Sequence, residues 1–150
     1  MSQAEQNKAV FRSFPERVFN TGNIDIVDEI MHPDIVDHAT PPGLPPGKEG
    51  LRLYVTELRN AFPDYHSNVI ELMADGDERV CGRLENTGTH LGTFMGIPPS
   101  GKKITWTESH WGRIVDGKLI EHWMDADMLG MLRQMGAIPE QQPAAQSAEG

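Results

Sequence analysis

The chain has 150 residues, of which 38% are hydrophobic and 23% are charged, as expected for one ordinary globular domain. Its net charge of −9, with no run of Lys or Arg, disfavours binding to nucleic acid or to an anionic membrane. Cys81 is the only cysteine, which excludes an internal disulfide. Because no apolar stretch approaches about 20 residues and no signal-peptide pattern is found, we expect a cytoplasmic protein.

The first half of the chain is predicted to be mainly helical. Apolar residues recur at helical spacing over residues 3–20, with a break expected at Pro15, and shorter helices follow at 24–31 and about 51–61. A short strand is predicted at 35–38. Residues 39–50 (ATPPGLPPGKEG) form a loop by composition, either a lid over a site or a plain surface excursion.

From Tyr65 onward the apolar period changes to two. Strands are predicted at 65–73, 78–90, 102–115 and 118–126, followed by a helix at 127–135 that Asp127 can cap. Helices followed by a run of antiparallel strands predict an α+β fold with the helices packed on one face of the sheet. We expect a single domain over residues 1–137 and a disordered, low-complexity tail at 138–150.

The strand predicted at 102–115 carries the residues of greatest chemical interest. Its even positions are Ile104, Trp106, Glu108 and His110, which alternation places on one face of the sheet. Apolar walls with a few placed polar groups are typical of a ligand pocket. The alternative is an open, solvated face, but a large aromatic such as Trp106 favours a covered one.

The residues that face this strand from 118–126 depend on the turn between the two strands. A two-residue turn at 116–117 (Asp-Gly) would place His110 opposite Trp123, and Glu108 opposite Asp125. Two carboxylates would then share the site.

A three-residue loop ending in a glycine bulge gives a different site. It would place His110 opposite His122, and Glu108 opposite Met124. The sequence permits both registers. In either one the neighbouring charges and burial would perturb the pKa values of the site.

Other kinds of chemistry have weaker support. His110, His122 and Glu108 could supply three metal ligands, but no motif of the HExxH kind is present, and we expect no metal and no other cofactor. No Gly-x-Ser-x-Gly segment is present, and Cys81 has no base beside it, which disfavours nucleophilic catalysis.

Five segments, taken in order, resemble the SnoaL-like polyketide cyclase (ester cyclase) family of the nuclear transport factor 2-like superfamily. The resemblance covers about residues 5–137, and its specificity lies in the ordered set rather than in any one segment. The segments are 19–23 (FNTGN), 32–38 (HPDIVDH), 61–64 (AFPD), 88–101 (GTHLGTFMGIPPSG) and 113–123 (RIVDGKLIEHW), the last running on into 127–136 (DMLGMLRQMG).

The resemblance implies a cone-shaped, curved antiparallel sheet wrapped by N-terminal helices, with a pocket for a small organic substrate inside. It implies the bulged turn, with His110, His122 and Glu108 pointing into the pocket. Trp111 and Trp123 would face the other side, where members of the family usually form homodimers.

In the polyketide cyclases an aspartate on the last strand acts as acid and base in an intramolecular aldol closure. The resemblance places Met124 at that position, and Glu108 where the cyclases carry a neutral amide. We therefore expect Glu108 to be the general base, with a pKa raised by apolar walls. His110 would orient it or donate to an oxyanion, His122 would assist, and Asp127 is a further catalytic candidate.

The remaining site residues are predicted to bind the substrate. Trp106, Met124 and Phe94 would shape the pocket, and His38 lies beside the proline-rich loop, either as a substrate contact or as a surface residue. The leading hypothesis is acid–base catalysis on a carbonyl compound. The alternatives are a non-catalytic, dimeric metabolite-binding domain and a hydrolase or dehydratase that activates water with a histidine–carboxylate pair.

Overall fold

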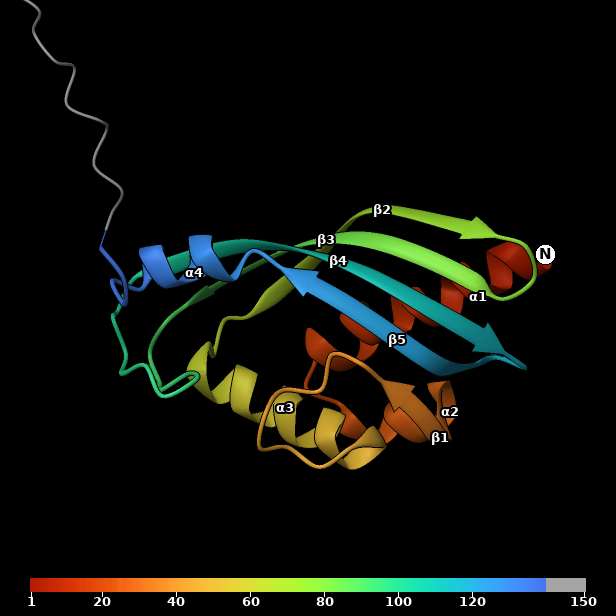
Figure 1. Cartoon of the computed structure of the whole chain (residues 1–150), viewed down its shortest axis with the longest axis horizontal. Coiled ribbons are helices and arrows are strands. Elements are labelled where there is room, and N and C mark those ends of the chain that lie inside the picture. The colour runs from red at the N-terminus through yellow and green to blue at the C-terminus, as the bar shows by residue number, and fades with distance from the viewer. Residues whose placement is uncertain (140–150) are drawn as a thin grey trace, which may run out of the picture.

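The computed structural model describes residues 1–139, so the predicted disordered tail lies, apart from its first two residues, outside the described chain. Helices dominate the first half, and a run of long strands follows (Figure 1). The elements of the first half are α1 (Gln3–Ser13), the π-helix η1 (Phe14–Phe19), the 3₁₀-helix η2 (Ile24–Ile26), α2 (Val27–Ile30), β1 (Met31–Asp37) and α3 (Gly47–Ala61). The elements of the second half are β2 (His66–Asp75), β3 (Arg79–Thr89), β4 (Lys103–Val115), β5 (Lys118–Ala126) and α4 (Met128–Gln134).

A break or kink was expected at Pro15, and the chain instead stays helical and changes helix type there. Proline has no N–H to donate to the preceding turn, and the wider η1 begins at Phe14, directly before it. The Asn20 N–H donates to the Pro15 carbonyl at 2.9 Å, which closes the wider turn. The helices of the described residues are all too short or too polar to cross a bilayer.

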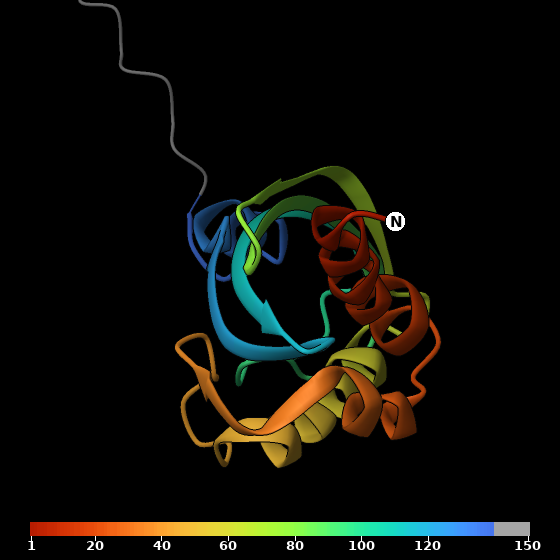
Figure 2. The same ribbon diagram turned by 90° about the vertical axis from the view of Figure 1, so that its right-hand side faces the viewer.

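The sheet has the strand order β1-β5-β4-β3-β2 and curves around the N-terminal helices, which lie on its concave side (Figure 2). Strands β2 to β5 form an antiparallel meander, as the alternating pattern predicted. The edge strand β1 pairs in parallel with β5 and makes the sheet mixed, which the sequence did not predict. The α+β fold is confirmed.

Neither of the predicted registers between β4 and β5 is the one observed. The turn has two residues, Asp116 and Gly117, both with positive φ (50° and 76°), as a tight hairpin turn of this kind requires. A β-bulge then shifts the register between Arg113 and Ile114.

The bulge decides which residues face each other further along the two strands. His110 lies opposite Met124, Glu108 lies opposite Ala126, and His122 lies opposite Gly112. The side chains of Glu108, His110 and His122 still share the inner face, as the resemblance implied, although the bulged turn from which that expectation came is wrong.

Two apolar clusters fill the ends of the concave side, and β4 passes through both. Ile114 belongs to one cluster, with Phe11 and Met31, and Trp106 belongs to the other, with Phe62. Between them the inner face of β4 carries Glu108 and His110. The polar site therefore lies between two packed apolar regions.

The segment at 19–23 joins the N-terminal helices to the sheet. The Asn20 side chain accepts a hydrogen bond from the Ser67 N–H at 2.7 Å and donates one to the Ser67 carbonyl at 3.0 Å. The Arg59 guanidinium donates to the Phe19 and Asn20 carbonyls at 2.9 and 3.2 Å. One side chain thus satisfies both backbone groups of a buried residue at the start of β2.

Replacing Asn20→Ala should lower the free energy of unfolding by about 1–3 kcal/mol, because two backbone groups in a buried segment lose their partner. Urea unfolding followed by circular dichroism measures the change. The matched control is Asn68→Ala, which removes an exposed asparagine from β2, the strand that Asn20 contacts. It should leave the stability within about 0.5 kcal/mol of the wild type. Equal effects of the two substitutions would contradict this role of Asn20.

Candidate functional site

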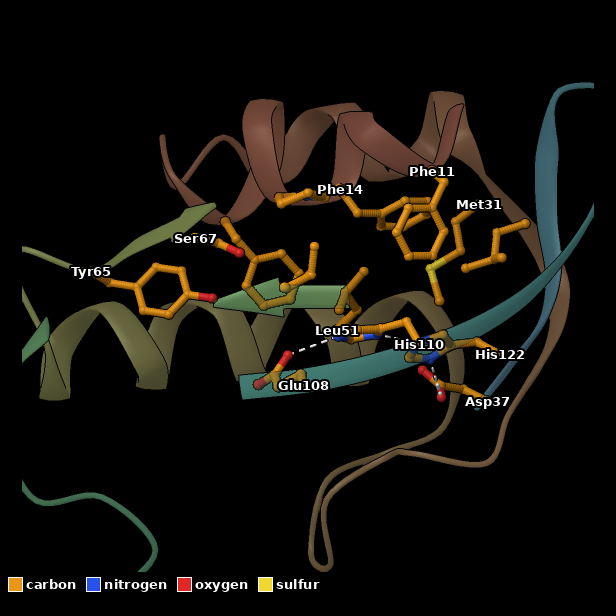
Figure 3. Close-up of a pocket in the computed structure, with 14 residues that line it drawn as sticks. Phe11, Phe14, Met31, Asp37, Leu51, Tyr65, Ser67, Glu108, His110 and His122 are labelled. Atoms are coloured by element: carbon orange, nitrogen blue, oxygen red, sulfur yellow. Dashed lines mark hydrogen bonds and ion pairs between the residues drawn. The ribbon is translucent and has the colours of Figure 1, made fainter. Parts of the chain in front are cut away.

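A continuous row of hydrogen bonds crosses the inner face of the sheet from β1 to β4 (Figure 3). The contacts run from Asp37 Oδ1 to His122 Nδ1 at 2.9 Å, from His122 Nε2 to His110 Nδ1 at 2.8 Å, and from His110 Nε2 to Glu108 Oε2 at 2.8 Å. The Trp106 indole N–H donates to the other carboxylate oxygen, Glu108 Oε1, at 3.0 Å. We call the four residues Asp37, His122, His110 and Glu108 the relay.

The two imidazoles of the relay meet end to end. Their ring centres are 5.1 Å apart and their planes are inclined by only 21°. With the two nitrogens 2.8 Å apart, this geometry suits an in-plane N–H···N hydrogen bond better than face-to-face stacking. The edge of Phe11 packs against the His110 ring, with their centres 6.0 Å apart, which leaves the ring little freedom to move.

The direction of the Glu108 pKa shift is opposite to the one predicted. Burial is the largest single influence and by itself raises the pKa of this carboxyl. The hydrogen bond and positive charge of His110, with further bonding from the Trp106 indole and the Asn86 amide, together outweigh burial and hold the pKa of Glu108 below its ordinary value. The carboxyl is therefore ionised at neutral pH despite its apolar surroundings.

Asp37 is the relay residue that the sequence analysis missed. It ends β1 opposite His122 on β5, and the Ala39 N–H donates to the same Oδ1 at 2.9 Å. Burial pushes the pKa of Asp37 upward, but its bonds to His122 and Ala39 and the charge of His122 hold it below the ordinary value. The sequence pattern drew attention to the next residue, His38, which lies just past the end of β1.

An inner chamber lies on one side of the relay. Its volume is about 560 Å³ with open solvent included, and it lies between η1, α1 and the concave face of the sheet (Figure 3). Its walls are mostly apolar, and its polar groups are the relay together with Tyr65 and Ser67. The apolar lining residues are Phe11, Phe14, Pro15, Phe19, Met31, Leu51, Leu84 and Leu119.

A wider outer cleft, about 1490 Å³ with the solvent at its mouth included, also reaches Glu108. Residues 38–44 form one wall, so the proline-rich loop borders the site rather than making a separate surface excursion. Methionines from β5, α4 and the loop after β3 form much of the rest. The methionines are Met95, Met124, Met128 and Met131. Glu108 is common to the chamber, the cleft and a smaller hollow between them.

Two tyrosine hydroxyl groups lie near the carboxylate. Burial, and after it the negative charge of Glu108, raises the pKa of both Tyr54 on α3 and Tyr65 just before β2. Both hydroxyls therefore remain protonated and can act as hydrogen-bond donors to a ligand. The sequence pattern did not single out these two tyrosines, because aromatic residues at such positions usually belong to the hydrophobic core.

The other predicted site residues divide into three groups. Trp106, Phe94 and Met124 line the outer cleft. His38 borders the cleft, but its ring stacks on Trp123 with centres 4.9 Å apart, and its Nε2 lies 3.2 Å from Glu121. Asp127 is not brought to the site: its side chain accepts from the Gly130 N–H at 2.9 Å and caps α4.

Within residues 1–139, no three His, Cys, Asp or Glu side chains converge in a way that could hold a metal ion. The relay residues lie in a row, so their nitrogen and oxygen atoms point at one another and not at a common point. The arrangement suits proton transfer between neighbouring groups.

Comparison with known proteins shows the family of this chain. The sequence profile described as SnoaL-like polyketide cyclase matches residues 9–135. This chain belongs to the SnoaL-like polyketide cyclase family. The nogalonic acid methyl ester cyclase of Streptomyces nogalater is 34% identical over 119 residues, which cover 79% of this chain and 89% of the cyclase. The aklanonic acid methyl ester cyclase DnrD of Streptomyces peucetius is 36% identical over 124 residues, covering 79% and 83%.

Two solved structures share the fold. TsrD from Streptomyces laurentii superimposes with a TM-score of 0.81 at 25% identity, covering 89% of this chain and 97% of TsrD. IdmH from Streptomyces antibioticus gives a TM-score of 0.75 at 31% identity, covering 87% of this chain and 99% of IdmH. The cone-shaped sheet with N-terminal helices that the resemblance implied is therefore the fold of this SnoaL-like protein.

The ionised carboxyls of the relay should make the stability of the protein sensitive to acid. Because the folded-state pKa values of Asp37 and Glu108 lie below their unfolded values, their stabilising contribution is complete above the unfolded values, near pH 4, and is lost as the pH falls through the folded ones. The free energy of unfolding of Asp37→Asn/Glu108→Gln should therefore fall less than that of the wild type between about pH 6 and about pH 3. Urea titrations at each pH measure it. Asp125→Asn, which changes an exposed carboxyl on β5, should keep the wild-type slope, and identical slopes for all three proteins would refute the prediction.

Proposed function

We propose that this protein is a cyclase that closes a ring within a carbonyl-containing, polyketide-derived ester by acid–base catalysis. Glu108 takes a proton from a carbon next to a carbonyl, and the electrons of that C–H bond form an enolate. The enolate carbon attacks a second carbonyl of the same molecule, and the resulting alkoxide recovers a proton from Glu108. Substrate and product are isomers, and the enzyme ends in its starting protonation state.

The position of Glu108 is the observation that carries this proposal. Its carboxylate lies where the inner chamber meets the outer cleft, and His110 and Trp106 fix both of its oxygens within 3.0 Å. An ionised, oriented base at the junction of two apolar cavities can meet a substrate that occupies either one. The Tyr54 and Tyr65 hydroxyls supply donors for a developing oxyanion.

The charge of the cavity favours an uncharged substrate. The lining residues of the chamber and the cleft include the carboxylates of Asp37, Glu57 and Glu108, and no Lys or Arg among the described residues. A carboxylic acid substrate would bring a further negative charge into this region without a partner. An ester avoids that cost, and the relatives named above are cyclases of methyl esters.

At position 124 of β5, where the resemblance implies an aspartate, this chain has a methionine. Met124 lies directly opposite His110, and Glu108 lies two residues from His110 along β4. A carboxylate at either position could contact the same imidazole. We therefore propose that Glu108 takes the role of the missing aspartate.

The alternative function is hydrolysis or dehydration by an activated water molecule. One observation favours it, because the His110 imidazole and the Glu108 carboxylate lie within hydrogen-bonding distance. Both ring nitrogens of His110 are engaged, however, one by Glu108 and the other by His122. Neither is free to take a proton from water, so ring closure is the better-supported reaction. The products distinguish the two, since cyclisation leaves the mass unchanged and ester hydrolysis releases methanol.

Glu108→Gln should reduce the cyclisation rate of aklanonic or nogalonic acid methyl ester by about 100- to 10,000-fold, because the amide cannot accept the proton. Product formation is followed by liquid chromatography and mass spectrometry with purified protein. Asp125→Asn, on the outer face of the neighbouring strand, is the matched control and should keep wild-type turnover. Full activity of Glu108→Gln would refute the assignment, and no turnover of either ester by the wild type would refute this substrate class.

We also propose a homodimer through the outer face of the sheet. Met73, Cys81, Trp111 and Trp123 lie in register across four neighbouring strands on that face. Met73 is 56% exposed and Trp111 is 53% exposed, an unusual degree for large apolar side chains. A contiguous apolar row of this kind is typical of a protein–protein contact, and the resemblance implies a second copy of the chain as the partner.

Trp111→Arg should convert the dimer into a monomer, because a charge would have to be buried at the centre of the contact. Size-exclusion chromatography with light scattering measures the mass at several protein concentrations. The control Trp111→Phe retains an apolar ring and should remain dimeric. A wild-type protein that is monomeric throughout, or a dimer that survives Trp111→Arg, would show that this face is not the contact.

A further inference from the structure

We infer that the relay holds three protons, so that its histidine pair carries one positive charge in common, and that Asp37 is the positioning residue that keeps the third proton in place. The inference deepens the proposed function, because Asp37 matters to the reaction only if Glu108 is the base. Its test needs no substrate, so the two can fail separately.

The first step is to count hydrogen-bond donors. The relay has three contacts of 2.8–2.9 Å, and each needs one proton between its two heavy atoms. Two ionised carboxylates have no proton to give, so His110 must donate through Nε2 to Glu108, and His122 must donate through Nδ1 to Asp37. Two neutral imidazoles have only these two protons.

The second step concerns the contact between the rings. With both ring protons already used, His110 Nδ1 and His122 Nε2 would face each other at 2.8 Å with two lone pairs and no proton between them. Moving a ring proton into that contact leaves a bare nitrogen against a carboxylate instead. Every fully hydrogen-bonded arrangement of the relay therefore contains three protons, and its net charge is −1.

The groups around the relay determine which charge can balance its two carboxylates. The charged and titratable groups that line the cavities around it are Glu57 and Tyr54 from α3, Tyr65 just before β2, and His38, whose Nε2 lies 3.2 Å from Glu121. No Lys or Arg of the described residues lines the chamber, the cleft or the hollow between them. The shared imidazolium is thus the counter-charge for two carboxylates in a largely apolar site.

Asp37 occupies the end of the row that is farther from Glu108. Its carboxylate holds the third proton electrostatically, and the Ala39 N–H fixes the orientation of its Oδ1. If Asp37 lost its charge, the histidine pair would face one carboxylate instead of two. The third proton would then be lost more easily, and Glu108 would lose the positive neighbour that keeps it ionised.

Nitrogen-15 NMR of the histidine side chains tests the proton count, since a protonated ring nitrogen and a bare one have well-separated chemical shifts. The wild-type protein at neutral pH should show three N–H groups on His110 and His122 together. The variants His110→Gln and His122→Gln assign the signals. Two N–H groups and two bare nitrogens in the wild type would overturn the inference, whatever the outcome with any variant.

Asp37→Asn tests the role of Asp37, because it keeps the shape of the side chain and removes its charge. The pair should then carry two protons instead of three, and the Glu108 carboxyl, followed by carbon-13 NMR, should titrate at a higher pH than in the wild type. Asp34→Asn, which removes an exposed charge from the same strand, should match the wild type in both measurements. An unchanged proton count or an unmoved Glu108 titration in Asp37→Asn would overturn the role assigned to Asp37.

Discussion

A carboxylate in an apolar cavity needs a counter-charge, and this requirement explains much of the structure around Glu108. Ionising a carboxyl away from water is costly unless donors and a positive charge surround it. The indole of Trp106 supplies one donor, and the imidazole of His110 supplies the other. His110 is in turn held by His122, and His122 by Asp37. The geometry of the sheet therefore has to bring side chains from β1, β4 and β5 onto one line.

The bulge in the hairpin is the feature that brings His122 onto this line. In a plain two-residue hairpin Val115 pairs with Lys118, and continuing that register would place Trp123 opposite His110 and leave His122 on the outer face. One extra residue of β5 lies between the Ile114–Leu119 and Arg113–Glu121 pairs. From there on, the β5 side chains that would have faced inward face outward, and the others face inward. His122 then points inward and Trp123 outward. One inserted residue thus builds the histidine pair and the outer apolar row at the same time.

The sequence predicted what depends on local patterns. Alternation along residues 104–110 placed Glu108 and His110 on one face with Trp106, and Asp127 caps α4 as expected. The register was not predictable, because Asp-Gly suits two turn types and nothing near Ile120 marks a bulge. Asp37 was missed because its role depends on the parallel pairing of β1 with β5, which joins residues 85 positions apart.

The predicted direction of the Glu108 pKa shift was wrong for a related reason. Apolar residues nearby are visible in the sequence, and burial is indeed the largest single influence on this carboxyl. The donors that outweigh burial become visible only once the strands are paired. A prediction from composition therefore places the pKa of a pocket carboxylate too high, because it includes the apolar lining residues but not the hydrogen-bond donors and charges that contact the carboxylate.

The exchange of an aspartate for Met124 has a geometric consequence for the reaction. Positions 108 and 124 flank the same imidazole, one along β4 and the other across the ladder on β5. The resemblance places the cyclase base at 124, whereas the carboxylate here stands at 108, closer to Trp106 and the Tyr65 side of the cavity. A base displaced by one strand reaches a different part of a ligand held in the same cleft. If the histidine pair is the fixed element, moving the carboxylate around it changes which carbon loses its proton while preserving the chemistry that removes it.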